Sequence, residues 1–132
     1  MVSPFRSVVI VVLVFGIPLP AAAGEPGLDE AQRLFYSGDY EAAAAIALAQ
    51  RLADADNLAA SEIRTSALHF AIRRAMGPLD SARGRPGENR DRAWKACSRC
   101  PDLLSEFLTE LDLGRTAARA RLKRTPDDVE GL

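Results

Sequence analysis

Apolar residues recur every three or four positions along most of the chain after residue 27, and no window alternates apolar and polar residues over the length of a strand. This spacing is typical of amphipathic helices. Residues that break helices separate the apolar segments at Gly38, at residues 54–57 and at residues 77–78. The sequence therefore predicts an all-α fold with helices over residues 28–37, 40–53, 58–76, 90–99 and 101–124, and an irregular loop over about residues 77–89.

The apolar stripes also predict which face of each helix is buried. The expected core residues are Leu28, Ala31, Leu34 and Phe35 in the first segment; Ala43, Ile46, Ala47 and Leu52 in the second; Ile63, Ala67, Phe70, Ala71 and Ala75 in the third; and Leu104, Phe107, Leu108, Leu111, Ala118 and Leu122 in the last. Small residues at facing positions let short helices pack closely as antiparallel pairs. We therefore expect helical hairpins.

The first 23 residues have the pattern of a cleavable secretory signal. Arg6 precedes an apolar run, Pro20 interrupts it, and small residues occupy positions 21–23. A membrane span needs about 20 apolar residues, and Pro18 and Pro20 interrupt the run before that length is reached. No cysteine follows the run to carry a lipid. We predict cleavage after Ala23, which leaves one domain over residues 24–132 and no stable membrane anchor.

Charge and composition narrow the class of partner. The formal charge is −1 for the whole chain and becomes −2 once Arg6 is removed. Binding to nucleic acid needs a net basic surface, so we expect no nucleic-acid partner. Nearly all the basic residues are arginine and alanine is abundant, which we interpret as a GC-rich bacterial genome. The expected location is the periplasm or the medium.

Three stretches of the chain resemble the tetratricopeptide repeat. They are LFYSGDYEAA at residues 34–43, which resembles the turn between the two helices of a repeat; DADN at residues 54–57, which resembles the linker between repeats; and RLKRTPDDVE at residues 121–130, which resembles a repeat end followed by the next start. The expected period is about 34 residues. The first hairpin carries most of the resemblance, and the middle of the chain departs from the pattern.

The resemblance implies a scaffold of stacked helical hairpins that binds a protein or peptide and is not an enzyme. It implies Tyr36 and Tyr40 as partner-contact residues. It also implies that residues 129–132 begin a further first helix, so that the chain is a truncated member with an apolar strip exposed on its last helix. That strip would favour self-association or the binding of a partner. A truncated fragment with no independent role remains an alternative.

Cys97 and Cys100 form a Cys-Ser-Arg-Cys motif followed by Pro101. In an oxidising compartment such a pair favours a disulfide. A thiol–disulfide oxidoreductase is the alternative, because a Cys-x-x-Cys pair at a helix N-terminus has a lowered thiol pKa. Structural zinc needs four ligands, and haem attachment needs a histidine where Pro101 stands. We therefore predict a disulfide and no cofactor.

The other polar residues support no catalytic constellation. His69 is the only histidine, and we interpret it as a packed or half-exposed helix residue. Asp56 or Asn57 is expected to cap the helix that follows. A basic cluster near Trp94 is expected to be a solvated surface, and Trp94 itself a core residue. The members of this basic cluster are Arg83, Arg85, Arg90, Arg92, Lys95 and Arg99.

Overall fold

The protein's structure is a computed structural model that describes residues 27–78 and 86–127. These residues form five helices and no strand: α1 Leu28–Ser37, α2 Tyr40–Ala53, α3 Leu58–Met76, α4 Pro86–Ala96 and α5 Cys100–Arg124. The all-α prediction is confirmed. The predicted signal peptide and the predicted first-helix start at residues 129–132 lie outside the described residues.

Three of the five helices have the bounds that the sequence predicts. The loop prediction over residues 77–89 is wrong from Pro86 onward, because α4 begins there rather than at residue 90. Proline at the first position of a helix loses no hydrogen bond, and Glu88 in the first turn favours the helix dipole. Residues 79–85 lie outside the described part of the chain, and the last helix begins at Cys100, one residue earlier than predicted.

Turn chemistry explains the sharp helix boundaries. Gly38 has a φ of 85° after α1, a conformation that favours glycine, and its N–H donates to the Phe35 carbonyl. The Asp39 carboxylate then accepts from the Ala42 N–H at 3.4 Å and begins α2. Asn57 caps α3 in the same way, since its side-chain oxygen accepts from the Ala60 N–H at 3.0 Å. The capping prediction is confirmed for Asn57.

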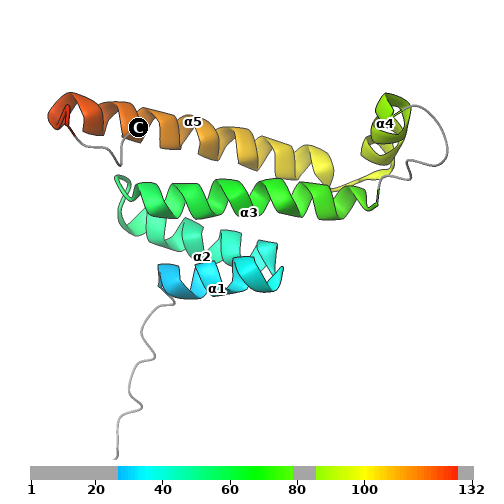
Figure 1. Cartoon of the computed structure of the whole chain (residues 1–132), viewed down its shortest axis with the longest axis horizontal. Helices are drawn as coiled ribbons and strands as arrows, with labels where there is room; N and C mark the ends of the chain where they lie inside the picture. The colour runs from blue at the N-terminus through cyan, green and yellow to red at the C-terminus, as the bar shows by residue number, and fades with distance from the viewer. Residues whose placement is uncertain (1–26, 79–85, 128–132) are drawn as a thin grey trace, which may run out of the picture.

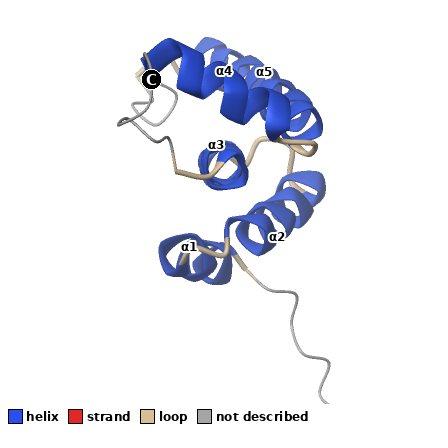
Figure 2. Cartoon of the chain, turned by 90° about the vertical axis from the view of Figure 1, so that its right-hand side faces the viewer, coloured by secondary structure: helices blue, strands red, loops and turns tan. Residues whose placement is uncertain are grey.

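Helix α3 lies in the middle of the molecule. It packs against α1 and α2 on one side and against α5 on the other, and α4 contacts its C-terminal end (Figures 1 and 2). Helices α1 and α2 run antiparallel, as do α3 and α5 (Figure 1). None of the described helices is long and apolar enough to cross a lipid bilayer.

Alanines form most of the buried seam. Ala43, Ala47, Ala60 and Ala67 have no exposed surface, which lets the backbones of α2 and α3 approach closely. Leu68, Ile72, Cys100 and Leu103 fill the space between α3 and α5, and Trp94 packs against this core as predicted. The core prediction is wrong for Leu52, which is 70% exposed at the end of α2.

The core prediction is also wrong for part of the last helix. The residues of α5 that are buried are Cys100, Leu103 and Glu110, whereas Leu108 is 53% exposed. The predicted residues Leu104 and Phe107 do pack against the core, so the sequence pattern identified one edge of the packed face together with the exposed Leu108. Leu103 and Glu110 are seven residues apart and share that packed face.

Candidate functional site

Aromatic side chains from three elements meet where α1 turns into α2. The Phe35 ring lies 5.5 Å from Tyr36, 5.6 Å from Tyr40 and 5.5 Å from Phe70, in edge-to-face contacts. Tyr40 and Phe70 stack with ring centroids 5.3 Å apart. Edge-to-face and offset stacks of this kind contribute about 0.5–1.5 kcal/mol each beyond their buried area. The cluster therefore fixes the α1–α2 turn against the outer face of α3.

A groove with a volume of about 370 Å³ runs between α1 and α3 beside this cluster. Its α1 wall is formed by Leu28, Gln32, Phe35 and Tyr36, and its α3 wall by Ala59, Glu62, Ile63 and Ser66. Both sets follow the three- and four-residue spacing of one helix face. The groove thus has an apolar lining with an amide, a hydroxyl and a carboxylate on its two walls.

Tyr36 is an exposed large hydrophobic residue on the groove, with 77% of its surface accessible. An exposed tyrosine supplies a flat apolar surface and a hydroxyl at low conformational cost, which makes tyrosine frequent at interfaces. Tyr40 is half-buried because it stacks on Phe70, and it faces a different hollow. The structure brings both predicted partner-contact residues to one cluster, but only Tyr36 lines the groove, and their contact with a partner stays a prediction.

The second hollow is more open, with a volume of about 650 Å³, and lies at the C-terminal end of α3. Tyr40, Phe70, Arg73 and Arg74 are among the residues that line it. The Arg73 guanidinium lies 5.8 Å from the Phe70 ring centroid, and Arg74 donates to the Gly38 carbonyl. The lining therefore combines two aromatic rings with two guanidinium groups.

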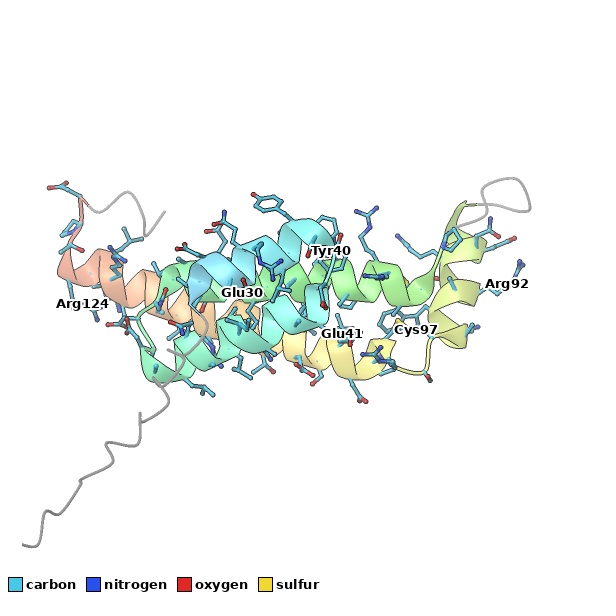
Figure 3. All side chains as sticks on the ribbon, turned by 90° about the horizontal axis from the view of Figure 1, so that it is seen from below. Glu30, Tyr40, Glu41, Arg92, Cys97 and Arg124 are labelled. Carbon is cyan, nitrogen blue, oxygen red and sulfur yellow. A yellow bond between two sulfur atoms is a disulfide. The ribbon has the colours of Figure 1, made fainter. Side chains whose placement is uncertain are left out.

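The sulfurs of Cys97 and Cys100 are 2.04 Å apart and form a disulfide at the junction of α4 and α5 (Figure 3). Cys100 has no exposed surface and belongs to the core with Leu103, whereas Cys97 is partly exposed. The bridge therefore holds the end of α4 against the first turn of α5. A thiol in solution would have to approach it from the Cys97 side.

A buried ion network joins α2, α3 and α5, and sequence analysis missed it. Glu110 of α5 is 2% exposed, and its two carboxylate oxygens lie 2.8 and 2.9 Å from Arg51 Nε. Ser61 donates to the same carboxylate at 3.0 Å, and Arg64 Nε lies 3.2 Å from it. Arg64 also donates to the Ala44 carbonyl and to Glu106, both at 2.9 Å.

The network contains two positive and two negative side chains, so it is neutral as a set. Its role is structural, because Glu110 and Arg64 lie inside the helix interface. The signal that could have found it is the helical register: Glu110 follows Leu103 and Phe107 on the core face, and Arg64 lies between Ala60 and Ala67. A charge on an apolar face needs a partner of opposite charge.

The remaining candidates of the sequence analysis are surface residues. His69 contacts the rings of Phe70 and Phe107 and is exposed. Within residues 27–78 and 86–127, no group of three or more histidine, cysteine or carboxylate side chains is placed to hold a metal ion. Of the basic cluster near Trp94, Arg99 pairs with Glu41 at 2.8 Å.

Comparison of the chain with protein-family models, with curated proteins and with solved structures finds no match.

Proposed function

We propose that this chain is a non-enzymatic protein-interaction module of tetratricopeptide-like architecture, which binds an extended peptide segment of a partner in the groove between α1 and α3, outside the cytoplasm. Architecture of this kind is consistent with the α1–α2 hairpin joined by a two-residue turn, with α3 beside α1, and with α5 running antiparallel to α3. Helix α4 would then be an insertion within the second hairpin.

The observation that carries the proposal is the exposed Tyr36 on an apolar groove. Leu28, Phe35 and Ile63 form a lining that would accept an apolar side chain, and Tyr36 would cover it. Gln32 and Ser66 provide hydrogen-bonding groups for a peptide backbone, as extended peptides require. The Glu62 carboxylate on the α3 wall favours a basic residue next to the apolar one.

The proposal is tested by selecting peptides from a random library displayed on phage, with the protein purified after export from a bacterial host. We expect enriched peptides that combine an apolar anchor with a basic neighbour. Tyr36→Ala should weaken their binding by about tenfold or more, because removal of a central aromatic contact costs about 1.4 kcal/mol or more.

Leu52→Ala is the matched control, because Leu52 is a similarly exposed apolar residue that does not line the groove. Its binding should equal that of the unsubstituted protein. Peptides that bind both variants equally well, or the absence of any enrichment, would exclude the groove as the binding site.

The alternative function, thiol–disulfide exchange, has one observation in its favour: Cys97 is partly exposed beside its partner at the first turn of a long helix. The complete burial of Cys100 in the core favours a structural bridge instead. Titration against a graded redox buffer distinguishes the two. We expect a reduction potential below about −300 mV, whereas a value between about −120 and −200 mV would identify an exchange catalyst.

A further inference from the structure

Helix α5 carries a second line of apolar residues along one flank of the face that packs on α3, and Leu104 at the start of this line also packs against the core. Leu104, Leu108, Leu111, Ala118 and Leu122, with Arg115 between them, follow one another at intervals of four, three, four, three and four residues. We call these six residues the outer stripe. Leu108 is 53% exposed, and the other apolar members are half-buried. A sustained alternation of four and three is the spacing by which one helix packs along another.

Contacts of α5 with the rest of the molecule show which way the outer stripe faces. Glu110 meets Arg51 of α2, and the Ser61 side chain of α3 lies 3.4 Å from the position a Cβ would take on Gly114. With 3.6 residues a turn, the middle of the outer stripe is rotated by about 120° from Glu110. The outer stripe therefore lies on the side of α5 turned away from α2.

Charge is divided sharply along α5. Its first fifteen residues, 100–114, contain four acidic residues and no basic one, and residues 115–124 contain five basic residues and no acidic one. Two such helices side by side in parallel would bring like charges together. Glu106, Glu110 and Arg124 form ion pairs within the chain. In the antiparallel orientation the exposed Asp112 of each copy would lie next to the exposed Arg115 of the other.

The outer stripe is also symmetric about position 113. In an antiparallel pair centred there, Leu104 meets Leu122, Leu108 meets Ala118, and Leu111 meets the stem of Arg115 of the second copy. Asp112, beside the stripe, comes next to Arg115 of that copy. Each contact then occurs twice, as a two-fold interface between identical chains requires.

We propose that two copies of this protein associate through the outer stripes of α5, in antiparallel orientation. A second copy fits this surface because the apolar residues and the flanking charges of one outer stripe pair with those of another. The association is independent of the peptide groove, which lies between α1 and α3.

The test is sedimentation equilibrium of the protein purified after export, over a range of concentrations. We expect a reversible monomer–dimer equilibrium. Leu108→Glu should raise the dissociation constant by about tenfold or more, because it places two charges in the apolar contact. Leu113→Glu is the matched control: Leu113 is 43% exposed on the same helix but lies outside the outer stripe, so this variant should dimerise normally.

A charge exchange tests the orientation. Asp112→Arg and Arg115→Asp should each weaken the dimer, because each places like charges opposite one another, and the double variant should restore it. Circular dichroism of every variant checks that the helices are intact. A monomer at all concentrations, a dimer insensitive to Leu108→Glu, or a double variant that fails to recover dimerisation would overturn the proposal.

Discussion

At the scale of single residues, the most consequential feature is a buried carboxylate that sequence analysis did not assign to the interior. Glu110 is buried because Arg51, 59 positions earlier, and Arg64 meet it in the folded chain. Nothing local to residue 110 indicates these partners. The helical period places Glu110 on the core face of α5, but whether a charge on that face is tolerated depends on contacts that only the tertiary structure supplies.

Glu110→Gln should destabilise the protein by about 3–5 kcal/mol, because it leaves Arg51 and Arg64 buried with too little negative charge. Urea unfolding followed by circular dichroism measures this loss. Glu106→Gln is the control, since the Glu106 side chain is 52% exposed, and it should cost much less. Equal effects of the two substitutions would contradict the account of the network.

Glu30 and Arg33 form a different kind of pair on the surface of α1. The Arg33 guanidinium donates to the Glu30 carboxylate at 2.6 and 2.7 Å, and these hydrogen bonds hold the pKa of Glu30 below its ordinary value. Because this pKa is lowered in the folded state, the contribution of the pair to stability is present at neutral pH. It is lost as the pH falls through the lowered pKa.

Arg33→Ala should therefore raise the pKa of Glu30 towards its ordinary value, as measured by NMR titration of its carboxyl carbon. The stability of the variant at neutral pH should change little, because the pair is exposed to solvent. A Glu30 titration that is the same in both proteins would contradict the ion pair.

At the scale of elements, the first three helices were predictable because turn chemistry and periodicity agree. Gly38, Asp39 and Asn57 each have a local conformational or capping reason for their positions. The start of α4 was missed because the glycines and prolines near Pro86 were interpreted only as helix breakers. Proline also suits the first position of a helix, and α4 does begin at Pro86.

The candidate groove was predictable only in part. Tyr36 was selected through the resemblance of residues 34–43 to a repeat turn, and it does lie on the groove. The α3 wall was not predicted, because the groove exists only where α1 and α3 lie side by side. Likewise, the sequence predicted an apolar stripe on the last helix, but the structure is needed to show that Leu104 and Phe107 pack against the core while Leu108 is exposed.

Helices α2 and α3 are held together by closely packed alanines, and a charge placed there should disrupt them. Ala47 has no exposed surface, so Ala47→Asp places an unpaired charge between closely packed helices and should unfold the first hairpin. Thermal unfolding and the helical circular dichroism signal measure the effect. Ala49→Asp, on the exposed face of the same helix, is the control and should leave both nearly unchanged. A normal melting temperature in Ala47→Asp would contradict the packing described for α2.

At the scale of the whole molecule, the described helices leave two separate surfaces that differ in chemistry. The groove between α1 and α3 combines an exposed aromatic residue with hydrogen-bonding groups, and we propose that it binds a peptide. The outer stripe of α5 is a line of apolar residues with Arg115 among them, and we propose that it binds a second copy. Pairing through α5 would leave both grooves open, and a dimer would then present two peptide sites.

The measurement that tests the central claim most directly is an NMR titration of the isotopically labelled protein with a peptide selected on it. The account predicts that the largest changes in backbone amide shifts occur along both walls of the groove, at Gln32, Tyr36, Glu62, Ile63 and Ser66. Tyr36→Ala should strongly reduce these changes at the same peptide concentration, in line with its weaker binding. Changes confined to α5 or to the region around Cys97, with the groove amides unaffected, would show that the binding surface lies elsewhere.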